Sequence, residues 1–354
     1  MIQVRTTSEG TRQNQEPVCY GNGIVDIPSA TISRCSDKFE MVMNPNLSLA
    51  YILSTKLPIQ YNRFPSSARK WVLVMHKADS DLSRHLATDI ARRMLVEAIR
   101  LLGFRLQRKN PPAFLVTHDV ETEEGLRRAG SLKRVEEEFN IHSTWFLPSD
   151  EYPIDRDIAK ELASGGTIGS HDLKHDGKLI HIKRRAELIE RMTQSRLRLE
   201  QITGADIRCF RAPLLQSSIR ILSVLHEAGY ALDFSIPCWE PVYPLTMSGF
   251  GIESSQAFEI NGVVEIPLTL FQDHQVLNVL GMSTAEAIRL WTNQAALIRS
   301  FDGDIVLLVH PDYSFSRDLP RYRHLLESLL EIASDEALQT ADETTGFARL
   351  NRTS

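Results

Sequence analysis

The 354-residue chain is 42% hydrophobic and 24% charged, which provides enough apolar sequence for a sizeable buried core. Its 40 Lys and Arg residues against 45 Asp and Glu residues argue against a general nucleic-acid-binding protein, because such binding needs a basic surface. No apolar run approaches the ~18 residues that a membrane-spanning helix needs, and the first residues lack the apolar segment of a secretion signal. We therefore expect a cytoplasmic chain without a membrane span, and its four widely spaced cysteines favour the same expectation.

The first part of the chain carries strand and turn signals but no motif with an evident chemistry. Residues 17–75 are predicted to form short strands and turns, and residues 83–103 are predicted to form a helix. Pro111-Pro112 then interrupts the chain. We predict an N-terminal α/β extension, a second domain and a polar tail, over residues 1–110, 111–340 and 341–354 respectively.

From residue 113 onward, strand and helix signals alternate. Short apolar runs predict strands at 113–116, 142–147, 166–170, 207–210, 231–234, 263–267 and 305–309. Amphipathic segments predict helices at 125–139, 155–164, 184–202, 217–228, 285–301 and 321–334. Repeated strand–helix units are typical of a parallel sheet, either closed or open, whose chemistry lies at the carboxyl ends of the strands.

Two carboxylates follow the first of these strands. Asp119 and Glu121 stand two residues apart, so on an extended chain they point the same way. Neighbouring carboxylates repel each other unless a cation or a shared proton lies between them. The alternative is a solvated acidic turn that opens the next helix.

Histidines and an arginine follow three other strands. His171 and His175, four residues apart after a glycine-rich strand, would lie on one side of a helical turn and could bind one metal ion. Arg211 would point inward and need a carboxylate partner, or else form a structural ion pair. His310 ends a buried strand, where it could exchange a proton or serve as a core histidine.

The order of these motifs resembles the polysaccharide deacetylase family (carbohydrate esterase family 4, the chitooligosaccharide deacetylase homology domain). The resemblance covers roughly residues 112–335. Its motifs are Thr117 to Glu121, His171 to His175, Arg211-Ala212-Pro213, Asp233-Phe234-Ser235 and Leu307 to His310. It implies a distorted (β/α)7–8 barrel and the metal-dependent hydrolysis of an N-acetyl or similar amide.

The resemblance also implies a role for each site residue. Glu121, His171 and His175 would hold a divalent transition metal, usually zinc and sometimes cobalt, nickel or iron. Asp119 would be the general base and Arg211 would orient it. His310 would be the general acid and Asp233 would hold it, while a backbone N–H near Leu214 would complete an oxyanion site. The turn at Phe271-Gln272-Asp273-His274 could reach the mouth of the barrel or equally be a plain loop, so it is left out of the predicted site.

Two positions depart from the family pattern, and three functional hypotheses follow. The usual metal carboxylate is Asp, whereas Glu121 is one methylene longer, and Leu214 stands where the family often has an aromatic residue. The first hypothesis is a cytoplasmic deacetylase of an N-acetylated sugar, set in surface-polysaccharide or lipopolysaccharide O-antigen biosynthesis. The second is an amidohydrolase of a small non-sugar amide, and the third is a catalytically silent barrel that binds sugar or metal. The sequence predicts no nucleic-acid partner and no particular oligomeric state.

Overall fold

The computed structural model of the chain describes residues 3–7, 18–19, 24–28, 113–237, 257–279, 281–300, 303–313 and 315–333. Near the N-terminus, three strands form a small sheet. Strand β1 (Gln3–Thr7) pairs antiparallel with β2 (Val18–Cys19) and parallel with β3 (Ile24–Pro28). The helix predicted at 83–103 and the predicted polar tail lie outside the described residues, and the domain boundary near 110 stays a prediction.

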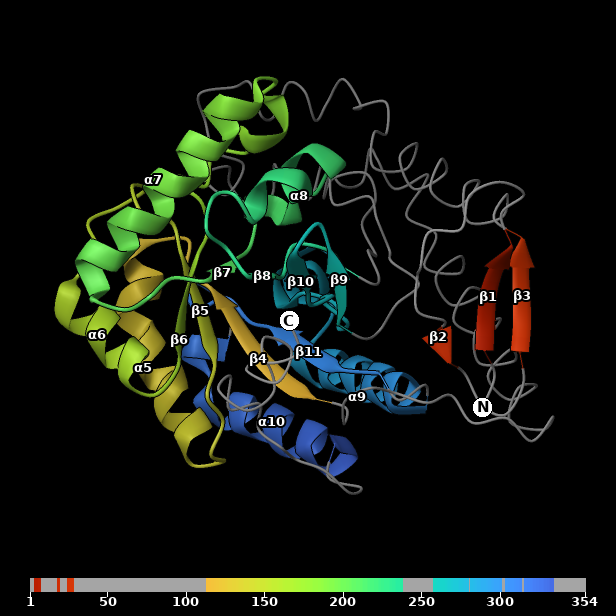
Figure 1. The fold of residues 1–354 in the computed structure, drawn as a ribbon. Coiled ribbons are helices and arrows are strands. Elements are labelled where there is room, and N and C mark those ends of the chain that lie inside the picture. The colour runs from red at the N-terminus through yellow and green to blue at the C-terminus, as the bar shows by residue number, and fades with distance from the viewer. Residues whose placement is uncertain are drawn as a thin grey trace.

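The rest of the described chain is built on an eight-stranded sheet (Figure 1). Its strands, in spatial order, are β11 (Ile305–Leu308), β4 (Phe114–Asp119), β5 (Thr144–Leu147), β6 (Thr167–Ser170), β7 (Cys209–Phe210), β8 (Leu232–Asp233), β10 (Val263–Glu265) and β9 (Phe258–Ile260). All neighbours pair in parallel except β10 and β9, which are antiparallel. The predicted parallel sheet is confirmed, and the short strand β9 is the one strand of this sheet that the sequence pattern did not indicate.

Helices follow the strands and cover the outside of the sheet (Figure 1). They are α5 (Glu123–Glu137), α6 (Arg156–Ser164), α7 (Arg185–Thr203), α8 (Ile219–Leu225), α9 (Thr284–Ser300) and α10 (Leu319–Ala333). Short helical turns lie at η2 (Leu179–His181), η3 (Pro213–Leu215), η4 (His274–Val279, a π-helix) and η5 (Phe315–Arg317). Local capping explains the boundaries: the Thr122 side chain accepts the Gly125 N–H at the start of α5, and α7 stops at Gly204 with φ 74°.

The sheet curls toward closure through the segment that follows β10. Leu268 forms an isolated bridge with Pro237, and the Leu270 N–H donates to the Val306 carbonyl of β11 at 3.1 Å. The Thr269 hydroxyl donates to the Asp304 carbonyl at 2.8 Å and accepts the Val306 N–H at 2.7 Å. These bonds bring the far side of the sheet back to β11, so the fold is the distorted (β/α) barrel that the motifs implied.

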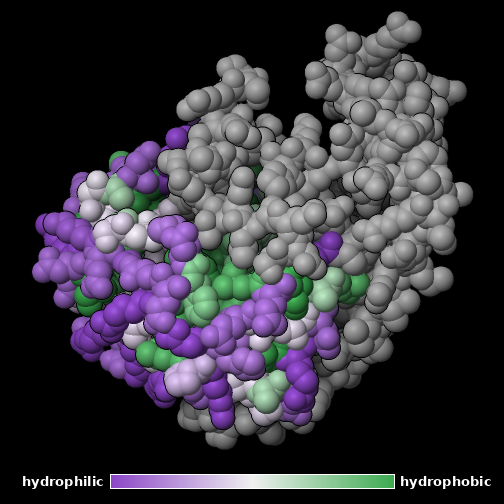
Figure 2. Space-filling view, turned by 90° about the horizontal axis from the view of Figure 1, so that it is seen from below, coloured by the Kyte–Doolittle hydropathy of each residue, from purple (hydrophilic) through white to green (hydrophobic). Residues whose placement is uncertain are grey.

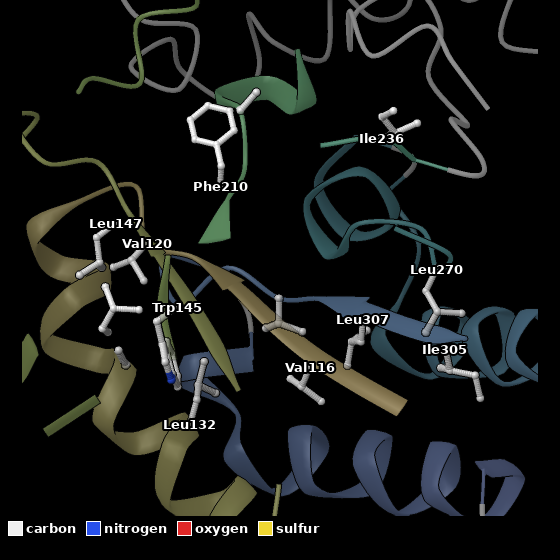
Figure 3. Close-up of a cluster of buried hydrophobic side chains, with 14 of the residues drawn as sticks. Val116, Val120, Leu132, Trp145, Leu147, Phe210, Ile236, Leu270, Ile305 and Leu307 are labelled. Carbon is white, nitrogen blue, oxygen red and sulfur yellow. The ribbon is translucent and has the colours of Figure 1, made fainter. Parts of the chain in front are cut away.

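The core lies between the strands and the helices. Val116 of β4 and Leu307 of β11 lie on the side of the sheet that faces α10, and Trp145 of β5 packs beside Leu132 of α5 (Figure 3). All four side chains are buried. The outer surface of the described residues in Figure 2 is mostly hydrophilic, as expected for amphipathic helices on a buried sheet. None of the described helices is long and apolar enough to cross a membrane.

Candidate active site

The carboxyl ends of four parallel strands bring the predicted site residues together. Asp119 is the last residue of β4, His171 and Arg211 directly follow β6 and β7, and His310 lies two residues beyond β11. Glu121 lies two residues beyond the end of β4. All five are buried, although each is polar or charged. Because parallel strands end at the same edge of a sheet, residues as far apart as 119 and 310 meet in one place.

Glu121, His171 and His175 form a group that can hold a metal ion. Each offers a ligand atom, and these atoms lie within 4.8 Å of one another. The Nδ1 atom of His171 lies 2.9 Å from the Arg211 carbonyl, which fixes the tautomer and leaves Nε2 for a ligand bond. Within the described residues, Nε2 of both histidines is buried and meets no hydrogen-bond geometry, although that of His175 lies 3.0 Å from Glu121 Oε1. Two orphaned imidazole nitrogens beside a carboxylate are the donor set of a three-ligand catalytic metal site, so the residues present fit a divalent cation.

The electrostatics of Glu121 and His171 match that role. Burial lowers the pKa of His171 to about 4 against the opposing charge of Asp119, so its imidazole is neutral near pH 7. Burial alone would raise the pKa of Glu121, but the charges of His175, His310 and His171 together outweigh it and hold the carboxyl ionised. A carboxylate and a neutral imidazole are the protonation states that bind a cation.

The loop that carries the two histidines is not the helical turn expected from their spacing. Residues 171–178 are irregular, and Asp172 has φ 64°, a left-handed conformation that is uncommon outside glycine. Arg191 of α7 holds this loop, donating from Nε and Nη2 to Asp172 at 2.6 to 3.0 Å and from Nη2 to Asp176 at 2.8 Å. The Nη2 of Arg191 therefore ties together two carboxylates that flank the metal histidines. The histidines converge because α7 clamps their loop, and the expected helical geometry is wrong.

Replacing Arg191 with Met should destabilise the fold by about 3 kcal/mol, because Asp172 is buried and would lose its cation. Burial already raises the pKa of Asp172 to about 6 against the Arg191 charge, and without Arg191 this pKa rises further. A carboxyl whose pKa is raised in the folded state makes the protein less stable as pH rises above the pKa of the unfolded chain, near 3.9. The loss, measured by urea unfolding, should therefore be larger at pH 8 than at pH 5.

The matched control is Arg185→Met on the same helix. Arg185 pairs with Glu227, and both side chains are more than half exposed. That change should cost less than about 1 kcal/mol at either pH. Equal losses in the two variants would contradict the proposed clamp.

Asp119 is paired with Arg211, as the sequence predicted for an inward arginine. The Nη1 of Arg211 donates to Asp119 Oδ1 at 3.0 Å and to the Thr117 hydroxyl at 2.9 Å, and its Nε donates to the Phe234 carbonyl at 3.0 Å. The guanidinium lies over the Phe146 ring, 4.4 Å from its centroid. Burial opposes ionisation of Asp119, but the charges of Arg211, His171 and His310 lower its pKa. Its Oδ2 lies 3.9 Å from His171 Nε2 and 4.0 Å from His310 Nε2, so it faces the proposed metal position.

His310 is held by Asp273, and the predicted pairing with Asp233 is wrong. Nδ1 of His310 lies 2.6 Å from Asp273 Oδ1, and the His310 N–H donates to Asp273 Oδ2 at 3.0 Å. Nε2 faces Glu121 Oε1 at 3.7 Å. Asp273 belongs to the 271–274 turn, so of the two alternatives for that turn the structure shows the one that reaches the site. Its place after a strand of the same sheet was the signal that could have included it, because strand ends converge.

Asp233 instead pairs with a second carboxyl group one strand away. The register aligns Asp233 of β8 with Glu265 of β10, and the Ser235 hydroxyl donates to Asp233 Oδ1 at 2.5 Å. The other oxygen of Asp233 and Oε2 of Glu265 are buried, and neither accepts a hydrogen bond from a donor among the described residues. Burial raises the pKa of both groups, and the charge of Asp233 raises that of Glu265 further. The raised pKa values favour one retained proton on the pair, and His310 has Asp273 as its carboxylate partner instead.

Replacing Glu265 with Gln should flatten the pH dependence of stability. The folded pair retains a proton that the unfolded chain releases above its ordinary pKa near 4.3, so wild-type stability falls as pH rises from there. The introduced amide cannot titrate, can still accept the Ile236 N–H that Glu265 Oε1 now accepts at 3.0 Å, and can donate to Asp233. Thermal unfolding at pH 6 and pH 9 should show a smaller fall in Tm for Glu265→Gln than for wild type. Parallel falls would mean that the pair holds no extra proton.

His118, the histidine of the first motif, is bonded within the core and belongs to no metal-binding group among the described residues. Its Nδ1 lies 2.8 Å from the Val309 carbonyl, its Nε2 lies 2.8 Å from Glu136 Oε1, and its ring stacks on Trp145 at 3.9 Å. Both ring nitrogens are thus satisfied within the core. The residue ties β4 to β11 and α5 and thereby supports Asp119.

Comparison with known proteins agrees with the motifs. Residues 117–232 match the model of the polysaccharide deacetylase family, which confirms the resemblance read from the sequence. This match spans Asp119, Glu121, the two metal histidines and Arg211. No curated protein matches the chain.

Three solved structures illustrate the likeness at the level of the whole chain. A Mycobacterium smegmatis protein assigned as a polysaccharide deacetylase matches with a TM-score of 0.51 at 19% identity, covering 65% of this chain and 87% of that chain. The chitin deacetylase of the fungal pathogen Colletotrichum lindemuthianum has a TM-score of 0.42 at 16% identity, covering 64% and 85%. A carbohydrate esterase family 4 pseudoenzyme from Bacillus anthracis has a TM-score of 0.43 at 14% identity, covering 63% and 62%. The first of these likenesses shows the fold of the barrel.

Proposed function

We propose that this chain is a metal-dependent hydrolase that removes the acetyl group from an N-acetylated sugar. One observation carries the proposal: Glu121, His171 and His175 offer ligand atoms within 4.8 Å of one another, beside a buried Asp119 and His310. The family match over residues 117–232 supports the substrate class, because the family is named for deacetylation of polysaccharides. We propose zinc as the metal, with cobalt, nickel or iron as alternatives.

The first half of the reaction depends on the metal bound by Glu121, His171 and His175 and on the general base Asp119. When bound, the cation would polarise the amide carbonyl and lower the pKa of a water molecule from ~15.7 toward ~7. Asp119 then accepts the proton of the attacking water through Oδ2, the oxygen that faces His171 and His310. Arg211, bonded to the other oxygen at 3.0 Å, keeps the carboxylate ionised and oriented.

The leaving nitrogen needs a proton from the opposite side. His310 can donate it from Nε2, because Asp273 binds Nδ1 at 2.6 Å and stabilises the charged imidazolium. Burial alone would lower the pKa of His310, but the charges of Asp273, Glu121 and Asp119 raise it to about 10. The acid is therefore protonated at neutral pH, while the base beside it is ionised.

The backbone after Arg211 supports the predicted oxyanion site. Leu214 has φ 59° and ψ 20°, and Leu215 follows with φ 51°, so two consecutive leucines adopt the left-handed region. This conformation costs about 1–2 kcal/mol for a residue with a side chain, and strain of this kind gathers at functional sites. We propose that the backbone N–H of Leu214 faces the developing oxyanion. Leucine in place of the family's aromatic residue would therefore remove no hydrogen-bond donor.

A screen for acetate release tests the proposal. The zinc-loaded full-length chain is incubated with N-acetylated sugar nucleotides, N-acetylated oligosaccharides and small cyclic amides. Release from the sugar nucleotides would support a role in surface-polysaccharide or O-antigen biosynthesis, which we propose as the setting. Release of ammonia or acid from small amides alone would favour the second hypothesis, and no release from any amide by the metal-loaded chain would favour a silent barrel.

A further inference from the structure

The turn after β11 contacts the metal carboxylate of β4. The Tyr313 N–H donates to the His310 carbonyl at 3.2 Å, and this turn brings residues 312 and 313 over residues 121 and 122. Asp312 Oδ2 accepts the Glu121 N–H at 3.1 Å, and Oδ1 accepts the Thr122 hydroxyl. The Tyr313 hydroxyl donates to Glu121 Oε2 at 3.3 Å. Backbone and side chain of Glu121 are thus held by two consecutive residues from a strand end almost two hundred positions away.

Helix α5 makes room for this contact with a glycine. A Cβ atom on Gly125 would lie 2.5–2.6 Å from the Asp312 carboxylate, too close for any side chain. A glycine in the first turn of α5 therefore leaves space for Asp312 to reach Glu121 and Thr122.

The two carboxylate oxygens of Glu121 have different partners. Oε1 lies 3.0 Å from His175 Nε2 and 3.7 Å from His310 Nε2, whereas Oε2 binds the Tyr313 hydroxyl. Glutamate has one more rotatable bond than aspartate, so its carboxylate needs an additional contact to keep a fixed direction. A hydrogen bond to the outer oxygen supplies that contact and leaves Oε1 toward the histidines.

We propose that Tyr313 is a positioning residue that directs Glu121 Oε1 to the metal. Its hydrogen bond allows glutamate to act as a metal ligand at a position where the shorter aspartate would need no such contact. This inference rests on the proposed function, because it assumes that the Glu121 group holds a divalent ion. It assigns to Tyr313 an effect on metal binding itself, separate from any effect on the substrate.

A double-mutant cycle on metal affinity tests the proposal. The full-length chain is freed of metal by chelation, and Zn²⁺ affinity is measured by competition with a chromogenic chelator for wild type, Tyr313→Phe, Glu121→Asp and the double variant. Tyr313→Phe should weaken Zn²⁺ binding about tenfold in the wild-type background, as removal of a partner of a metal ligand does. In the Glu121→Asp background the same change should matter less than about twofold, because the shorter carboxylate does not reach the hydroxyl.

The visible spectrum of bound Co²⁺ provides a second readout. Loss of the Tyr313 hydroxyl frees Oε2 to join Oε1 on the ion, and the absorption bands of Co²⁺ weaken as its coordination number rises. The matched control is Tyr152→Phe, because the Tyr152 hydroxyl donates to the Val120 carbonyl at 2.7 Å rather than to a metal carboxylate. That variant should retain the wild-type spectrum and Zn²⁺ affinity to within about twofold.

Three outcomes separate this inference from the proposed function. Unchanged Zn²⁺ affinity and Co²⁺ spectrum in Tyr313→Phe, with a raised KM, would overturn the inference and place Tyr313 against substrate. Equal losses in both Glu121 backgrounds would also overturn it, because the effect would not pass through the longer side chain. A wild-type chain that binds Zn²⁺ and responds as expected but hydrolyses no amide would uphold the inference and reject the deacetylase.

Discussion

Replacing Asp119 with Asn should abolish hydrolysis while the metal stays bound. The Asn oxygen can still accept from Arg211 Nη1, now 3.0 Å from Asp119 Oδ1, so the pocket keeps its shape. The amide cannot take a proton from water, and loss of a general base costs about 10²–10⁴-fold. We expect kcat to fall about 10³-fold, with about one Zn²⁺ per chain in both proteins.

Metal content and acetate release measured on the same samples decide this prediction. His175→Ala is the matched comparison, because it should lose both the metal and the activity. Wild-type rates in Asp119→Asn would reject Asp119 as the base. Loss of metal together with activity in Asp119→Asn would instead make Asp119 part of the metal group.

Replacing Asp273 with Asn should impair the general acid and shift its pH dependence. Activity requires protonated His310, so it is lost as pH rises through the pKa of that residue. Burial lowers this pKa, and the charge of Asp273 is the largest influence that raises it. Without that charge the pKa falls, so the alkaline limb of the rate profile should move down by more than about one pH unit. At pH 10 we therefore expect kcat to fall at least about fivefold relative to wild type, because the protonated share of His310 drops from about half to about a tenth.

Asp233→Asn distinguishes the observed partner of His310 from the one that the motifs implied. Asp233 lies beside Ser235 and Glu265, so its replacement should leave the alkaline limb in place. The pH profiles of kcat for the two variants and the wild type provide the measurement. A shift in Asp233→Asn with none in Asp273→Asn would restore the original assignment.

Much of the barrel could be predicted because its strands and helices have strong local signals. Apolar runs such as Ile305–Leu308 and the capped helix that begins at Glu123 are predicted within a few residues of their observed bounds. Strand β9 was missed because its three residues are too short for a period to be recognised. The π-helix His274–Val279 was missed because its residues match neither a regular strand nor a regular helix.

For the site, too, local sequence patterns predicted some features, whereas others depend on contacts between residues far apart in the chain. The sequence by itself indicated which groups gather at the candidate site, since Asp119, Glu121, His171, His175, Arg211 and His310 each follow an apolar strand and their order resembles that of one family. Only the tertiary structure decided which of these groups touch. The partner of His310 depends on the direction in which the chain leaves β10, and the place of the two metal histidines depends on Arg191 from a separate helix. Strand ends are encoded by short-range patterns, whereas contacts across the mouth of a barrel are set by register and curvature, which no local pattern specifies.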